Sequence, residues 1–166
     1  MKNGCLVASK KQAMNITLIC LGKLKESYWR EAEAEYLKRL SSTYKITIRE
    51  LKERSFSEKD DPATIKLQES ELIKNELKKA KTGPILALSE NGQQFSSTKF
   101  AEIFKNSANF TLIIGGPLGL DESIIKLADK VISLSPLTFT HQMARVILWE
   151  QIYRSYMINT GRKYNY

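Results

Sequence analysis

Residues 110–156 constrain the fold of this chain more than any other stretch. A mainly apolar run at 110–114 ends abruptly at Gly115-Gly116-Pro117, and Gly119 follows closely. This pattern predicts a buried strand and a sharp turn where the backbone can approach a ligand without an intervening side chain. A second short strand, a polar loop and a long helix are predicted at 131–134, 135–140 and 141–160. If the two strands are parallel neighbours, their carboxyl-end loops form one pocket.

The rest of the chain alternates between strand and helix patterns. Further strands are predicted at 16–20, 45–51 and 85–88, and helices at 27–40, 63–81, 97–105 and 121–130. We expect Ser97 to be an N-cap and Gly161 to follow the last helix as its C′ residue. In the first helix, spacing predicts a shared face for Tyr28, Ala32, Tyr36 and Leu40. Strands interleaved with helices indicate an α/β domain with a mainly parallel sheet and flanking helices.

The length predicts one domain, residues 14–166, because 166 residues with 42% hydrophobic side chains suffice for one core. The apolar part of residues 1–13 is too short for a signal peptide, so we interpret this segment as an upstream start or a disordered extension. No run approaches the length of a membrane span. The two cysteines, Cys5 and Cys20, form no CxxC motif and have no histidine cluster nearby. We therefore expect no metal and a reducing, cytoplasmic location.

The charge balance favours a polyanionic partner. Lys and Arg number 26 against 18 Asp and Glu, which gives a formal net charge of +8 at pH 7. Nucleic acid is one such partner, although many basic proteins bind none.

Three features carry candidate chemistry, and each has a purely structural alternative. The glycine turn lacks the Lys-Ser/Thr of a P-loop and does not fit GxGxxG, so it is either a ligand cradle or a simple turn. His141, the only histidine, starts the last helix with Arg145 at i+4, and a capping or packing role would explain it equally. The last helix also carries an apolar stripe that would suit the core or a dimer face: Val146, Trp149, Ile152, Tyr153 and Tyr156.

Four separated segments together give a specific resemblance. They are IIGGPLGL, SLSPLTFTHQMARVILWEQIYRSY, NITLICLGKLKESYWREAEAEYLKRL and LALSENGQQFSS. In combination the chain resembles the ribosomal RNA large subunit methyltransferase H family of SPOUT-class enzymes, over nearly all of residues 14–164. The resemblance implies an α/β fold with a C-terminal trefoil knot that binds S-adenosylmethionine. It also implies a cytoplasmic, metal-independent homodimer that methylates N3 of a pseudouridine in helix 69 of 23S rRNA on the assembled ribosome.

Particular site residues follow from the resemblance. His141 would help to shape the site, Arg145 would orient RNA or an anionic base edge, and Arg154 would contact phosphate or the second subunit. The implied cofactor-binding residues come from three segments of the chain: Leu88, Gly115, Gly116, Leu134, Ser135, Pro136, Leu137, Thr138 and Phe139.

The C-terminal tail departs from the family pattern Gly-x-x-Tyr-His-x. Here Tyr164 matches, but Asn165 stands where histidine is expected. Both residues are catalytic candidates, although an Asn side chain can hydrogen-bond a base edge and cannot accept a proton near neutral pH. Arg162 and Lys163 add charge suited to RNA.

This departure keeps a second class of function open. It is a non-catalytic ribosome-binding or assembly protein that retains the knotted fold. A third class, an unrelated nucleotide-binding enzyme, is disfavoured because both nucleotide fingerprints are missing.

Overall fold

The sheet of this protein is entirely parallel. The structure, a computed structural model, describes residues 14–164. Its strands are β1 (Met14–Leu21), β2 (Tyr44–Leu51), β3 (Ile85–Gln94), β4 (Asn109–Ile114) and β5 (Lys130–Ser133). They are ordered β2-β1-β4-β3-β5, and each neighbouring pair is parallel. This confirms the predicted α/β architecture, whereas the trefoil knot stays a prediction.

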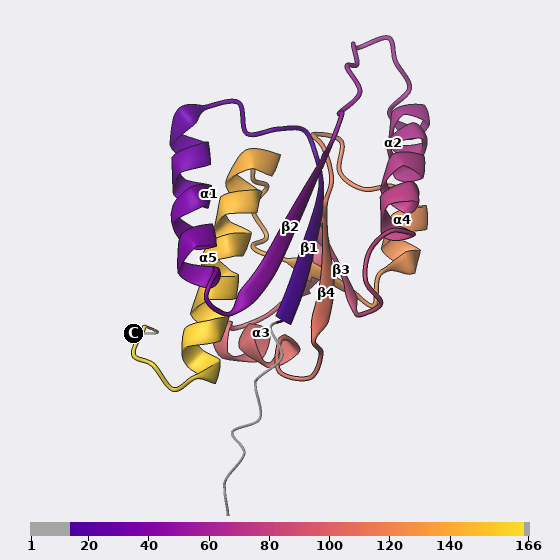
Figure 1. Ribbon diagram of the computed structural model, residues 1–166. Coiled ribbons are helices and arrows are strands. Elements are labelled where there is room, and N and C mark those ends of the chain that lie inside the picture. Colours follow the sequence, from indigo (N-terminus) through magenta and orange to yellow (C-terminus); the bar gives the residue numbers. More distant parts are fainter. Residues whose placement is uncertain (1–13, 165–166) are drawn as a thin grey trace, which may run out of the picture.

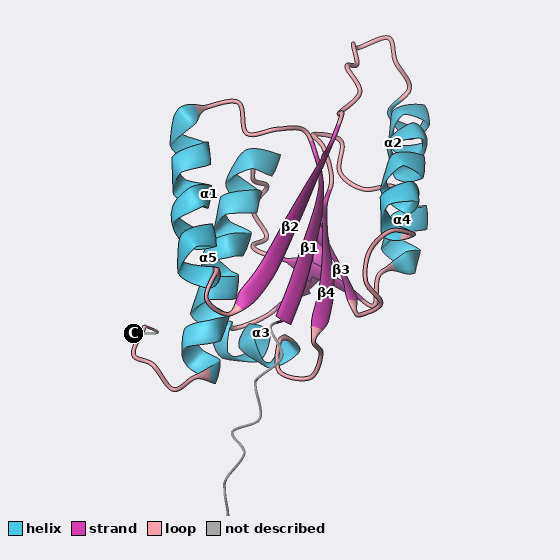
Figure 2. Ribbon diagram, in the orientation of Figure 1, coloured by secondary structure: helices cyan, strands magenta, loops and turns pink. Residues whose placement is uncertain are grey.

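Helices cover both faces of the sheet, as Figures 1 and 2 show. Helices α1 (Ser27–Leu40) and α5 (His141–Asn159) lie on one face, and α2 (Pro62–Leu77) and α4 (Glu122–Leu127) lie on the other. Helix α3 (Ser97–Ile103) packs beside α5 at the end of the sheet where β1 begins. Within residues 14–164, no helix has both the length and the apolar character needed to cross a bilayer.

Two apolar clusters form the core because strand side chains alternate between the faces. On β1, Ile16 and Leu18 join the cluster under α1 and α5, which includes Trp149. Ile19 lies on the opposite face and joins the cluster under α2 and α4, which includes Ile73. Burial on both faces explains why the central strands are continuous apolar runs.

Side-chain caps set most helix starts. Asp61 accepts hydrogen bonds from the Ala63 and Thr64 backbone N–H groups, with Pro62 at the first helical position. The N-cap of α3 is Ser96, which accepts from Lys99 N, so the prediction of Ser97 was wrong by one residue. At the end of α5, Gly161 has a φ of 68°, which confirms its predicted C′ role.

Strand β3 is longer than the predicted 85–88. Its pairing with β5 is interrupted after Leu88 and resumes at Gln93, which pairs with Ile132. Gly92 allows this close approach, since a Cβ there would lie 2.5 Å from the Ile132 carbonyl carbon. The other strands begin or end within two residues of their predicted bounds, whereas α2, α3 and α4 stop before the predicted residues 81, 105 and 130.

The predicted apolar face of α1 was partly wrong. Tyr28 is 59% exposed, whereas the inward face includes the buried Glu33 and Leu40. A glutamate occupies this core position because a buried arginine on α5 pairs with it. Hydrophobic spacing alone could not reveal that pairing.

Candidate functional site

A pocket of about 870 Å³ opens at the carboxyl edge of the sheet. Residues 88–91 of β3 line it, together with the loops that follow β4 and β5, the start of α5 and Lys66 of α2. The prediction that two neighbouring strand ends form the pocket was wrong in one respect, because β3 lies between β4 and β5. Residues 88–91, where the pairing of β3 with β5 is interrupted, therefore form the middle wall of the site.

The glycine turn after β4 depends on its lack of side chains. Gly119 N donates a hydrogen bond to Gly116 O at 2.9 Å, and Gly119 has a φ of 77°. A Cβ on Gly115 would lie 2.8 Å from the Gly119 carbonyl carbon. The turn thus has no room for a side chain at Gly115, and it presents bare backbone to the pocket.

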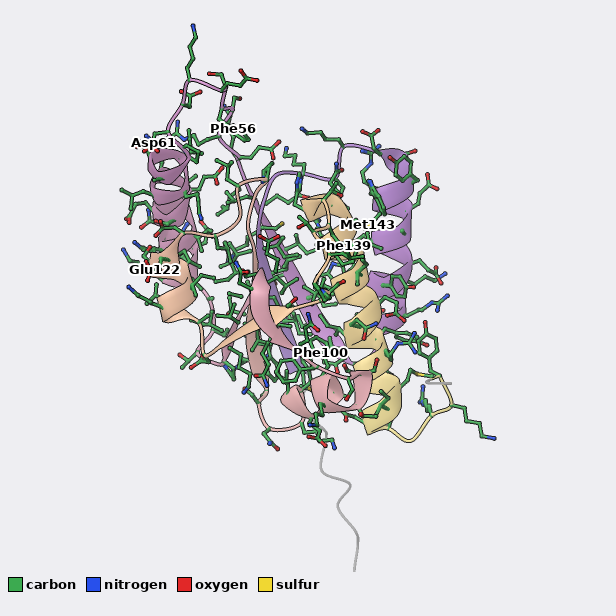
Figure 3. The ribbon with its side chains drawn as sticks, turned by 180° about the vertical axis from the view of Figure 1, so that it is seen from behind. Phe56, Asp61, Phe100, Glu122, Phe139 and Met143 are labelled. Carbon is green, nitrogen blue, oxygen red and sulfur yellow. The ribbon has the colours of Figure 1, made fainter. Side chains whose placement is uncertain are left out.

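Polar contacts hold the loop after β5 in place. Ser135 Oγ accepts from Leu137 N at 3.0 Å, and Thr138 Oγ1 donates to Glu90 Oε2 at 2.8 Å. The second contact joins the loop after β5 to β3 across the pocket. Leu137 is 72% exposed at this edge. Figure 3 shows Phe139 beside the start of α5, close to Met143 in the first turn of that helix.

The predicted cofactor residues gather at this pocket. All of them line it except Pro136, which lies within the loop after β5. That they bind the cofactor stays a prediction.

His141 lines the pocket at the first position of α5. Its Nε2 lies 4.0 Å from Glu53 Oε2, and neither buried atom has a hydrogen-bond partner within residues 14–164. Burial lowers the pKa of His141 below its ordinary 6.5, against the opposing effect of the Glu53 charge. Lys25 Nζ pairs with the other Glu53 oxygen at 3.1 Å, and Lys25 N donates to Gln142 Oε1.

Arg145 lies in the interior and not in the pocket. It is 4% exposed; its Nη2 donates to Glu33 Oε2 and its Nη1 to Glu50 Oε1, each at 2.7 Å. Trp149 Nε1 also donates to Glu33, at 2.8 Å. Burial acts to lower the pKa of Arg145, but its hydrogen bonds to Glu33 and the neighbouring carboxylate charges outweigh this and raise it. The side chain is thus enclosed by its carboxylate partners, and its contact with RNA stays a prediction.

This buried cluster joins α5 to α1 and β2. We call Arg145, Glu33, Glu50 and Trp149 the α5 clamp. Cys20 lies against it, with its Sγ 3.4 Å from Arg145 Nη1. Burial raises the pKa of the Cys20 thiol to about 11, so it stays protonated at neutral pH. The clamp fixes the helix turn that follows His141.

The tail lies at the other end of α5. Tyr164 packs edge-on against Tyr153, with ring centroids 4.9 Å apart, and the Arg154 guanidinium lies 5.0 Å from the Tyr164 ring. Arg162 stacks on Tyr156, and Lys163 is exposed. None of these residues lines the pocket, and Asn165 lies outside the described residues. Within one chain, His141 and Tyr164 are therefore at opposite ends of the helix.

Sequence reasoning missed several residues around the site. Lys66 enters the pocket from α2, Glu53 faces His141, and Glu33 and Glu50 hold Arg145. No local motif marks them, since each meets its partner only through tertiary packing. Within residues 14–164, no group of three His, Cys, Asp or Glu side chains is arranged to hold a metal ion.

Comparisons with known proteins agree with this geometry. A family model described as "Predicted SPOUT methyltransferase" matches residues 14–165. The "Ribosomal RNA large subunit methyltransferase H" of Clostridium novyi is 44% identical over 161 residues, covering 92% of this chain and 99% of the relative. The protein of the same name from Lactobacillus helveticus is 40% identical with the same coverage.

A solved structure, a probable methylase family protein from Haemophilus influenzae, shares the fold. Its TM-score is 0.53 at 10% identity, over 92% of this chain and 70% of that one.

Proposed function

The chain belongs to the SPOUT methyltransferase family, and on that premise we propose that it methylates ribosomal RNA with S-adenosylmethionine. The specific target is N3 of a pseudouridine in helix 69 of 23S rRNA, on the assembled ribosome in the cytoplasm. The pocket at the carboxyl edge of the sheet carries this proposal, because the glycine turn leaves bare backbone exposed to it. The names of the relatives, which are ribosomal RNA methyltransferases, support the choice of substrate.

The pocket fits the cofactor in size and in chemistry. Its volume of about 870 Å³ lies within the range of small-molecule sites. The cofactor supplies an electrophilic methyl group on a sulfonium centre. In this proposal, Gly115 and Gly116 allow its close approach, while backbone groups of residues 134–139 hydrogen-bond adenine and ribose. Methyl transfer then requires mainly alignment of the nucleophile and removal of its proton.

The charge of the chain supports a nucleic-acid substrate. The formal net charge is +8, and Arg162 and Lys163 lie at the exposed C-terminal end. When such basic side chains contact RNA, they neutralise phosphates and release counterions. Affinity for ribosomes should therefore fall steeply as the salt concentration rises.

The position of the tail supports a homodimer. Helix α5 has 19 residues, which corresponds to about 28 Å at 1.5 Å per residue, and separates Tyr164 from the pocket of its own chain. If Tyr164 and Asn165 act at the reacting base, a second subunit has to supply them. A strictly monomeric active protein in analytical ultracentrifugation would contradict this.

Mass spectrometry of helix 69 tests the activity directly. Assembled ribosomes that lack this methyl group are incubated with the protein and the cofactor, and the helix 69 fragment is then analysed. One added methyl on the pseudouridine is the expected result. Gly115→Val serves as the control, because its side chain would collide with Gly119. No methyl on the fragment, despite saturable cofactor binding in calorimetry, would overturn the proposed target.

Mixed dimers test whether the tail acts in the partner's pocket. Tyr164→Ala chains, with a defective tail, are combined with Gly115→Val chains, which have a defective pocket. If the tail crosses between subunits, each mixed dimer has one complete site, and activity returns. Activity no higher than that of either parent would show that tail and pocket act within one chain.

The alternative, a non-catalytic ribosome-binding protein, rests on Asn165. It predicts that the native chain binds ribosomes and cofactor without methylating helix 69. In that case Asn165→His would restore methylation if the missing histidine is the only defect. Methylation by the native chain would exclude this alternative.

A further inference from the structure

Two buried polar atoms face each other at the edge of the pocket without a hydrogen bond. They are Glu53 Oε2 and His141 Nε2, 4.0 Å apart. Gly22 lies directly beside them, since a Cβ there would be 2.9 Å from Glu53 Oε2 and 3.0 Å from His141 Nε2. Its φ of 82° belongs to a backbone region that favours glycine. The local backbone thus leaves space for a carboxylate and an imidazole to meet.

A carboxylate favours one tautomer of a neighbouring imidazole. Buried polar atoms without partners are unfavourable, so the pair gains stability when Nε2 carries a hydrogen and donates it to Glu53. The other nitrogen, Nδ1, then carries a free lone pair. Within residues 14–164, Nδ1 has no hydrogen-bond partner, and unlike Nε2 it is not sealed from solvent. His141 lines the pocket, so this lone pair is available there.

The charged groups around the pair determine its protonation. Lys25 neutralises the other oxygen of Glu53, and Arg145 lies one turn along α5, where its charge opposes a second cation. Burial likewise favours the neutral ring, while Glu53 favours the charged one. The ring is therefore neutral and able to accept a proton at neutral pH, and Glu53 stabilises the imidazolium that results.

We propose that Glu53 positions His141 as the general base of the reaction. Glu53 holds hydrogen on Nε2, and Nδ1 of His141 accepts the proton of the substrate's ring nitrogen. The inference rests on the proposed function, since it assigns the proton acceptor for methylation of an N–H group. Glu53 does not line the pocket and acts only through His141.

The step balances in atoms and charge. The N3–H bond of the base breaks, and its proton moves to Nδ1. The electron pair left on N3 forms the bond to the methyl carbon, while the electron pair of the broken carbon–sulfur bond stays on sulfur as a neutral thioether. The imidazolium beside Glu53 later releases its proton to water. The positive charge thus moves from sulfonium to imidazolium, next to a carboxylate.

Nuclear magnetic resonance can test the pair without any substrate. His141 is the only histidine, so untagged protein labelled with ¹⁵N gives a single set of ring signals. The native protein should show the Nε2–H tautomer. In Glu53→Gln the pKa of His141 should fall, because the carboxylate charge that raises it is gone. Glu58→Gln, in the same loop and exposed, should leave the pKa unchanged. A native Nδ1–H tautomer, or equal pKa values in both variants, would overturn the proposal.

The pH dependence of methylation provides a second readout. In Glu53→Gln, the plateau rate should fall by about 10- to 100-fold, and the acid limb of the rate profile should move to lower pH. Cofactor affinity in calorimetry should stay unchanged. A slower variant with an unmoved acid limb would show that Glu53 has only a structural role. If native protein leaves helix 69 unmethylated, the proposed function fails, and the resonance measurement still decides whether Glu53 controls His141.

Discussion

Helix α5 carries two arginines in opposite settings. Near its start, Arg145 is almost fully buried and bonds to carboxylates from α1 and β2, far away in sequence. Near its end, the Arg154 side chain is 24% exposed and pairs with Glu150 of the same helix, four residues earlier. A buried charge must be matched by fixed partners, whereas a surface pair contributes little and can exchange partners. The start of α5 is therefore held by partners from other elements, whereas the Arg154 pair near its end lies within the helix itself.

The largest expected effect is the loss of Arg145. Arg145→Met leaves the Glu33 carboxylate buried without a cation, and we expect the free energy of unfolding to fall by about 3–5 kcal/mol. Arg154→Met should cost less, about 1 kcal/mol, since its pair is partly exposed and spans only one helix turn. Urea denaturation of both variants measures the difference. Equal losses of unfolding free energy would show that the two arginines contribute equally to stability.

A change in the tail should affect activity more than stability. Tyr164→Ala removes one edge-on ring contact, so the free energy of unfolding should fall by about 0.5–1.5 kcal/mol. If Tyr164 aligns the reacting base, methylation should fall on the order of 100-fold, with unchanged cofactor affinity. Methylation assays and calorimetry measure the two quantities. Tyr164→Phe keeps the ring and separates the hydroxyl's role from packing. If Tyr164→Ala instead lost cofactor binding, the tail would be needed to form the cofactor pocket itself.

The smallest expected effect is the contribution that the titration of His141 makes to the pH dependence of the free energy of unfolding. Burial lowers its pKa below 6.5 in the folded state, so the unfolded chain binds more protons between the two values. The stability that the neutral His141 provides is fully present above pH 6.5. It is lost as the pH falls through the pKa of His141 in the folded state. The free energy of unfolding should decline more steeply with acid in the native protein than in His141→Gln. Parallel declines would show that His141 titrates alike in both states.

Local patterns predicted two walls of the pocket because each of these walls is one continuous segment of the chain. Glycines at 115, 116 and 119 mark a turn in any context, and the loop at 135–140 follows a strand directly. No local sequence pattern indicates the α5 clamp, because Arg145 lies 112 residues from Glu33 and 95 residues from Glu50. Strand order was equally hidden, so the placement of β3 between β4 and β5 could not be foreseen. Sequence reasoning thus predicted the loops and the α/β class, but not the pairings that position them.

The distance in sequence between Arg145 and Glu33 also affects how the chain is made. During synthesis, α1 and β1 emerge long before α5, so their apolar surface around Ile16 and Leu18 stays without its cover until α5 has been made. Contacts between distant residues also slow folding, because the chain must close a long loop before it gains them. The pocket, whose walls include the start of α5, can therefore be completed only after α5 has been added. A nascent chain that lacks α5 has neither a finished core nor a finished site.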